Sequence, residues 1–89
     1  MATLLVGYDK HEGEDYTALE NALKKFSAWW HHLDSTWLVS TTSTVTEVRD
    51  HLGALLDATD RLLVLDVSSD SAAWCGFNPE ASQWIKQHL

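Results

Sequence analysis

The side chain best suited to chemistry is Asp9, because it directly follows a short apolar run from Leu4 to Tyr8. A strand that is apolar at almost every position must be covered by other elements, so its last residue lies at an edge of the sheet. Mg²⁺ prefers oxygen ligands, and it binds one or two protein carboxylates while it keeps several waters. Asp9 is therefore a candidate catalytic and metal-binding residue for phosphodiester cleavage. The alternative is an aspartate that caps the next loop or pairs with Lys10 or Arg61.

A second candidate for catalysis is His32, which lies in the segment Trp29-Trp30-His31-His32. Neighbouring residues of a strand point to opposite faces, so the two imidazole rings cannot line one site. His32 would share its face with Trp30 and Asp34, and an imidazole changes charge near neutral pH, which suits a general acid or base. The favoured alternative is that both histidines pack among the tryptophans or at a dimer contact.

Three acidic residues, Glu12, Glu14 and Asp15, lie close together after the first apolar run. Such a group is most simply a solvated loop, and it is also able to imitate a row of phosphates for a basic partner. These three residues are therefore candidate binding residues for a basic protein.

Aromatic residues supply the remaining binding candidates, and the chain has five tryptophans. Nucleic-acid bases stack on such rings with about 1–3 kcal/mol each, but no basic residues that would hold a nucleic-acid backbone flank them. Packing in the core or in a protein interface is favoured instead, and Trp74 and Phe77, which fall in a loop, are the best interface candidates. Trp37 and Ser35 complete the candidate binding residues. The alternative for Ser35 is a turn hydroxyl without chemistry.

Composition limits the classes of function. The chain has 13 acidic and 6 basic residues and a formal net charge of −7, which repels a phosphate backbone. Nucleic-acid binding would therefore need a local basic patch or a bound cation. Cys75 is the only cysteine. It excludes an internal disulfide, suits a reducing cytoplasm, and is expected to be partly buried. No apolar run approaches the roughly 18 residues of a membrane span, and no signal peptide is recognisable, so we expect neither membrane insertion nor export.

Three segments have the apolar spacing of amphipathic helices, over about residues 15–26, 44–56 and 78–87. Their expected N-terminal signals are Asp15, the capping box of Thr44 and Glu47, and Asn78 followed by Pro79. The side chains expected to face the core are, in turn, Tyr16, Leu19, Leu23 and Phe26; Val45, Val48, Leu52 and Leu55; and Ala81, Trp84, Ile85 and Leu89.

Four segments have the composition of strands, over residues 3–9, about 29–33, about 36–41 and 61–67, with turn residues between the middle two. The order β-α-β-β-α-β is the ferredoxin-like arrangement, an α+β fold, here with an added C-terminal helix. We expect a single domain over residues 1–89, with a core over 1–67 and a loop and helix over 68–89. If the strands lie in the order 4-1-3-2, one end of the sheet gathers Asp9, Asp34, Ser35, Arg61 and His32.

Several of these segments resemble those of known families. Nearly the whole chain is similar to the small SinR-type proteins of bacteria and phages, through residues 6–9, the stretch from Trp29 to Val39, and residues 62–67. Residues 3 to about 67 are more distantly similar to the Cas-two-type CRISPR adaptation subunits. In that resemblance Asp9 matches the aspartate of strand one, and Ser35 and Trp37 match the serine and the aromatic residue of a turn.

The distant resemblance implies a homodimer in which the two strand-one aspartates face each other and hold a divalent metal such as Mg²⁺. The basic residues of that family's first helix are missing, and Glu20 and Asn21 stand there instead. We therefore expect a small, acidic, homodimeric, non-catalytic or cryptic interaction protein with a basic protein partner. One alternative is a metal-dependent ribonuclease or other nuclease that uses Asp9 of each subunit. Another is a phage-type inhibitor or nucleic-acid mimic that acts on a CRISPR-like machine.

Overall fold

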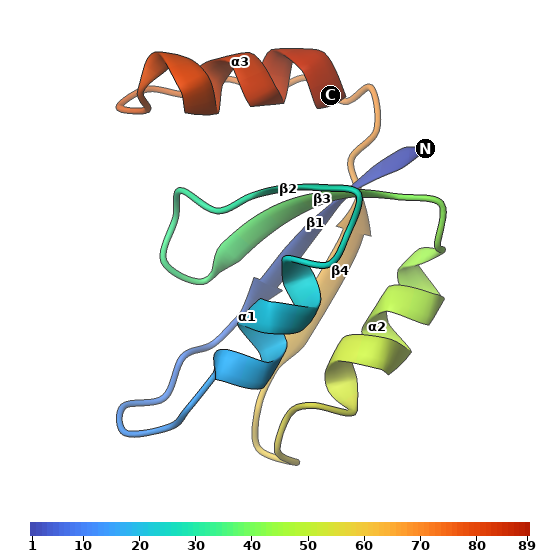
Figure 1. Cartoon of the computed structure of the whole chain (residues 1–89), viewed down its shortest axis with the longest axis vertical. Coiled ribbons are helices and arrows are strands. Elements are labelled where there is room, and N and C mark those ends of the chain that lie inside the picture. The colour runs from blue at the N-terminus through green and yellow to red at the C-terminus, as the bar shows by residue number, and fades with distance from the viewer.

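The computed structural model describes residues 1–89, and Figure 1 shows a single sheet with helices on both sides of it. The elements in chain order are β1 (Ala2–Tyr8), α1 (Thr17–Leu23), β2 (Ala28–Trp30), β3 (Thr36–Thr41), α2 (Val45–Gly53), β4 (Leu62–Asp66) and α3 (Pro79–His88). The chain is thus an α+β protein, and its first six elements follow the order β-α-β-β-α-β that the sequence predicts.

The four strands form one antiparallel sheet in the order β2-β3-β1-β4, which is the order 4-1-3-2 read from the opposite edge. The central strand β1 pairs with β3 and with β4, so that Leu5 lies opposite both Leu38 and Leu65. β2 pairs with β3, and Trp30 lies opposite Leu38. β2 and β4 are therefore the two edges of the sheet.

The main core lies between the sheet and the helices α1 and α2, on the side that we call the helix face. Figure 1 shows these two helices side by side there. Every second residue of a strand points into this core, and so do helix residues spaced by about four. The apolar faces of the sheet and of the two helices therefore pack against each other. Its ten buried residues are Leu4, Val6, Tyr8, Tyr16, Leu19, Leu23, Trp37, Val39, Val48 and Leu52.

The opposite side of the sheet, which we call the α3 face, is partly covered by α3. Ala81 and Ile85 of this helix are buried against Trp30 and Leu38. The indole Nε1 of Trp30 donates a hydrogen bond to the carbonyl of Ala81 at 3.1 Å. The polar atom of a large buried ring is thereby satisfied, and α3 is fixed over β2 and β3.

The C-terminal end of α3 is attached to the start of β1, because the hydroxyl of Thr3 donates to the carbonyl of His88. The β4 side of the α3 face is more open. Leu63 and Leu65 point to this face and remain 57% and 45% exposed. The large apolar side chains that β4 presents on this face are thus left in contact with solvent.

The predicted starts of α2 and α3 are confirmed. Thr44 Oγ1 accepts from the N–H of Glu47 at 3.1 Å, and Glu47 Oε1 accepts from the N–H of Thr44 at 2.9 Å. Asn78 Oδ1 accepts from the N–H of Ala81 at 2.8 Å, with Pro79 at the first helical position. The first N–H groups of a helix have no partner within it, so these bonds determine where both helices begin.

The first helix is shorter than predicted. It begins after Tyr16, and Asp15 is not its cap, because the Asp15 carboxylate instead accepts from the N–H of Thr17 at 2.9 Å in a local turn. The predicted apolar face is otherwise confirmed. Phe26 lies beyond the end of α1, and it is partly buried against the core.

Two further expectations are wrong, and a third is confirmed. The strand predicted over 29–33 ends at Trp30, since the turn residues that follow Leu33 release the chain from the sheet early. Leu55 is 43% exposed because α2 ends at Gly53, before the predicted stripe is complete. In α3 the predicted apolar contact is confirmed: Ala81 and Ile85 are buried, and Trp84 and Leu89 pack against the same cluster while partly buried.

Candidate functional site

Asp9 lies just beyond the end of β1, where the predicted meeting of distant residues is confirmed. The backbone N–H of Tyr8 donates to the carbonyl of Ser35 at 3.2 Å, and the N–H of Asp9 donates to the carbonyl of Arg61 at 3.3 Å. Asp9, Ser35 and Arg61 line one open hollow of about 310 Å³. The carboxylate of Asp9 is exposed and forms an ion pair with neither Lys10 nor Arg61.

Lys10 instead pairs with Asp34, and this contact joins the loop after β1 to the turn before β3. The ammonium Nζ of Lys10 lies 3.1 Å from Oδ1 of Asp34. The hydrogen bond to Asp34 raises the pKa of Lys10 above its usual value. The side chain of Asp34 is 87% exposed, so solvent screens the pair and limits its contribution to stability to about 1 kcal/mol or less.

Next to Asp9, the hydroxyl of Tyr16 connects two loops. It accepts from the backbone N–H of His11 at 2.8 Å. Three acceptors lie within reach of its own proton: the carbonyl of Asp9 at 3.3 Å, and the carboxylates of Glu14 at 3.3 Å and Asp60 at 3.4 Å. A phenol has one proton, so it donates to one of these groups at a time. Tyr16 thus joins the loop after β1 to the loop before β4.

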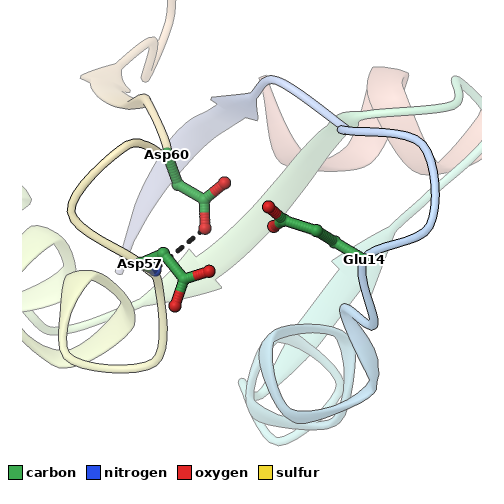
Figure 2. A group of neighbouring side chains, drawn as sticks. All are labelled: Glu14, Asp57 and Asp60. Atoms are coloured by element: carbon green, nitrogen blue, oxygen red, sulfur yellow. Dashed lines mark hydrogen bonds between the residues drawn. The ribbon is translucent and has the colours of Figure 1, made fainter.

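Figure 2 shows the carboxylates of Glu14, Asp57 and Asp60 turned towards one another from these two loops. One oxygen of each lies within 4.8 Å of the others. Asp60 Oδ2 also accepts from the N–H of Asp57 at 2.9 Å. Carboxylates at this spacing are ligands that Mg²⁺ and Ca²⁺ prefer. Asp9, the residue predicted for a metal, does not belong to this group.

Asp60 is the most enclosed of the three, with 3% of its side chain exposed. The imidazole Nε2 of His11 lies 3.5 Å from its Oδ1, and the N–H of Asp57 and the hydroxyl of Tyr16 also face it. A buried carboxylate is tolerated when it has such partners. The chain therefore supplies the donors that Asp60 requires, with no need of an added cation.

The two clearest electrostatic effects near this group are at Tyr16 and Asp15. Burial raises the pKa of the Tyr16 phenol; the N–H of His11 lowers it, and the charges of Asp60 and Glu14 raise it further. The phenol is consequently a hydrogen-bond donor at neutral pH. The hydrogen bonds from the hydroxyl and the N–H of Thr17 lower the pKa of Asp15, which is therefore charged at neutral pH.

The acids of both loops form one continuous surface, because two adjoining hollows share Glu14 and Asp15. We call the following four exposed residues the acidic surface: Glu12, Glu14, Asp15 and Asp57. Asp60 lies enclosed beside them. The basic side chains along these hollows are Lys10 and His11, and each already faces a carboxylate of the chain. The surface is therefore negative and lacks a free cation of its own.

His31 does not lie on a strand, since β2 ends at Trp30. Its ring stacks on Trp37, with ring centroids 3.8 Å apart and planes 13° apart. Its Nε2 lies 3.1 Å from the backbone carbonyl of Asp34. The ring is thus held by packing and by one backbone contact.

His32 does not form the predicted acid–base pair with Asp34. Its ring packs against Trp30 and Phe77, at centroid distances of 5.1 Å and 6.4 Å, while the carboxylate of Asp34 binds Lys10. The favoured alternative of histidines packed among aromatic residues is confirmed.

Trp37 belongs to the core and not to a binding surface. It is 0% exposed, and its indole Nε1 donates to the hydroxyl of Tyr8 at 3.2 Å. A ring without exposed area cannot stack on a base or contact a partner. The alternation of β3 accounts for this, because Trp37 and Val39 point to the helix face.

Trp74 and Phe77 are half-buried beside α3, and Trp74 Nε1 donates to the hydroxyl of Ser82 at 3.1 Å. Both rings line an apolar cavity of about 300 Å³ between the α3 face and the segment that precedes α3. Both loop aromatic residues therefore already make packing contacts within the chain. Cys75, which lies between them in sequence, is exposed and not partly buried as expected.

Sequence reasoning missed Asp57 and Asp60, which it treated only as the end of a helix. Tyr16 and Asp60 are 44 positions apart, and the pairing of β1 with β4 brings their loops together. The predicted strand order contains a signal for this contact, because it makes Asp9 and Arg61 neighbours and so places the residue before Arg61 beside the loop after β1.

No known protein-family model matches this chain, and no solved structure matches it. None of its helices has both the length and the apolar character that crossing a bilayer requires.

Proposed function

We propose that this chain is a small, acidic, homodimeric interaction protein with a ferredoxin-like fold, and that its acidic surface binds a basic protein partner. The element order and the strand order β2-β3-β1-β4 support the fold. One observation above all supports the partner class: Glu14, Asp57 and Asp60 converge from two loops to within 4.8 Å.

Several clustered carboxylates suit a partner rich in arginine and lysine. Charge-assisted hydrogen bonds between such groups are stronger than neutral ones, and the negative potential accelerates encounter with a positive surface. The formal net charge of −7 favours the same partner and disfavours nucleic acid. A phage-type inhibitor or nucleic-acid mimic would use this surface to occupy the basic groove of a CRISPR-like machine.

The arrangement around Asp9 supports a non-catalytic role. The hollow that Asp9 lines contains no other carboxylate. Glu14, Asp57 and Asp60 together line a different hollow. A single exposed aspartate is a weak ligand for Mg²⁺, so metal-assisted cleavage at this position requires the aspartate of a second chain.

The test of the proposed surface is a charge reversal with a matched control. The variant Glu12→Lys/Glu14→Lys/Asp15→Lys and the control Asp50→Lys/Asp70→Lys/Glu80→Lys change net charge equally, and the control residues are exposed elsewhere. Binding of an arginine-rich peptide is measured by calorimetry at low and at moderate salt. We expect the first variant to lose binding at least about tenfold more than the control. Equal losses in both variants would show that only net charge matters and would contradict a defined site.

A second candidate function is a metal-dependent nuclease, and one observation favours it. Asp9 and Arg61 line the same hollow, which places a ligand for Mg²⁺ beside a guanidinium that suits a phosphate. RNA and DNA cleavage is measured with and without Mg²⁺, for the unaltered chain, for Asp9→Asn and for the control Asp70→Asn. Cleavage that needs Mg²⁺, is lost in Asp9→Asn and persists in the control would establish the nuclease. No cleavage by the unaltered chain would eliminate it.

A further inference from the structure

We propose that the second copy in the homodimer binds along the edge of β4, so that the two sheets join into one continuous sheet. This inference rests on the proposed homodimer and specifies its surface. β4 is an edge strand, and no element of the chain lies beyond it in the sheet. Edge strands are usually protected by charged side chains, prolines or bulges. β4 has no lysine, proline or bulge, its one charged residue is Asp66 at its end, and it pairs with β1 in unbroken register.

The free backbone groups of this edge follow from the hydrogen bonds at the two ends of β4. The N–H of Asp9 donates to the carbonyl of Arg61, and the N–H of Val67 donates to the carbonyl of Thr3. In an antiparallel pair, bonded residues alternate with residues that turn away from the neighbour. Three residues of β4 therefore direct both their N–H and their C=O groups away from β1, and they are Leu62, Val64 and Asp66.

A two-fold axis at Val64 pairs all of these groups. Val64 then lies opposite Val64 of the partner subunit, and Leu62 lies opposite Asp66 of the partner subunit. All pairs are of the hydrogen-bonded kind, which gives about six backbone hydrogen bonds. An axis shifted by one residue would place Leu62 or Asp66 opposite a loop residue. The contact uses the same patch of both chains, so it closes as a dimer and does not grow further.

The same register covers the apolar side chains that the single chain leaves exposed. Leu63, which is 57% exposed, faces Leu65 of the partner subunit, and Leu65, which is 45% exposed, faces Leu63 of the partner subunit. These are non-hydrogen-bonded pairs, whose side chains approach most closely. The patch is thus complementary to itself in this register.

Charge on the helix face agrees with this arrangement. Arg49 of α2 lines a hollow together with Leu62 and Val64, and its only ion-pair partner in the chain is the neighbouring Asp50, with both side chains 63% exposed. Asp66 of the partner subunit, which lies opposite Leu62, would enter beside this guanidinium. Symmetry repeats the contact, so the dimer gains two opposite-charge pairs.

This geometry has a consequence for Asp9. β1 lies on the far side of β4 from the axis, so the two Asp9 carboxylates would lie on the order of 20 Å apart, given the spacing of strands and residues. They could not share a metal ion. The β4 dimer and the nuclease alternative therefore exclude each other.

The test measures the mass of the full chain by light scattering and sedimentation over a range of concentrations. The interface is short, so we expect a dimer that dissociates at about micromolar concentration. Leu63→Lys and Leu65→Glu should each weaken self-association by about tenfold or more, whereas the control Leu55→Lys, at an exposed leucine elsewhere, should not. Val64→Pro should also weaken self-association. It removes an N–H that points outward, and it removes no hydrogen bond to β1.

The register is tested by mixing Leu63→Lys with Leu65→Glu. In the mixed dimer one contact joins the new lysine to the new glutamate, and the other restores the leucine pair. We expect the mixture to form heterodimers about tenfold more strongly than either variant forms homodimers. A monomer at every concentration would overturn the homodimer itself. A dimer that is insensitive to both leucine variants would overturn this surface alone, as would a mixture that forms no heterodimer.

Discussion

The phenolic oxygen of Tyr16 lies 3.4 Å from Oδ1 of Asp60, across 44 positions of the chain. This contact joins the loop after β1 to the loop before β4, and the acidic surface is built on these two loops. The Tyr16 ring is itself anchored in the core against Tyr8, with ring centroids 5.8 Å apart. A buried aromatic residue thus links the two loops that carry these acids.

Replacement of Tyr16 by phenylalanine should loosen the first of these loops without disturbing the core. The backbone N–H of His11 loses its acceptor, which lies at 2.8 Å, while the ring packing is kept. We expect the amide hydrogen of His11 to exchange with solvent about tenfold faster. Hydrogen exchange followed by NMR measures this rate. Tyr8→Phe serves as the control and should leave that amide unchanged; equal effects of both variants would contradict the assigned role.

Alkaline pH should destabilise the fold once it rises past the usual tyrosine pKa of 10.0. Burial raises the pKa of both tyrosines, Tyr8 and Tyr16, above the usual value of 10.0. As pH rises, the unfolded chain loses these protons first, so stability is intact below pH 10 and is lost as pH rises through the folded-state pKa values.

The absorbance of phenolate measures this ionisation in the folded chain and in the chain unfolded by urea. The folded curve should lie at higher pH than the unfolded curve. Tyr16→Phe should remove about half of the signal and leave the remainder shifted. Coincident curves for the folded and unfolded chain would contradict the prediction.

Loss of the capping box should destabilise α2. Thr44→Ala removes the oxygen that accepts from the N–H of Glu47, and we expect a cost of about 1 kcal/mol in the free energy of unfolding. Unfolding by urea, followed by circular dichroism, measures this difference. Thr46→Ala is the matched control on the same helix, because the side chain of Thr46 is exposed and caps nothing. A cost in the control as large as that of Thr44→Ala would count against the cap.

Truncation of Ile85 should show that α3 is part of the cooperative fold. Ile85 is 5% exposed and packs with Trp30 and Leu38 on the α3 face. Ile85→Ala should lower the free energy of unfolding by about 2–5 kcal/mol. Gln87→Ala, at an exposed position of the same helix, should change it by less than about 0.5 kcal/mol. If Ile85→Ala has no measurable effect, α3 does not unfold together with the sheet.

The helices that sequence predicted best are those with explicit capping residues. Thr44 with Glu47, and Asn78 with Pro79, begin α2 and α3 as expected, because these signals act within one turn of chain. The signal expected for the first helix, Asp15, does not cap it, since the Asp15 carboxylate accepts from the N–H of Thr17 in a separate turn. Its start was therefore predicted less well than its buried face.

The candidate site was predicted only in part. The meeting of Asp9, Ser35 and Arg61 followed from the strand order 4-1-3-2, which was a condition of that prediction and which the structure has. The pairing of Lys10 with Asp34 and the packing of His32 on Trp30 and Phe77 depend on loop conformations, and no local pattern encodes those.

The sequence by itself determined the alternation of strands and helices, the caps of two helices and the excess of negative charge, because each of these depends on neighbouring residues or on composition. Only the tertiary structure decided that Trp37 is buried, that Glu14 meets Asp57 and Asp60, and that β4 has a free edge with two exposed leucines. The physical reason is that these features depend on which face of the sheet a segment packs against and which segments lie beside it. That choice is made by the packing of the whole chain, since burial of apolar area is shared among all elements at once.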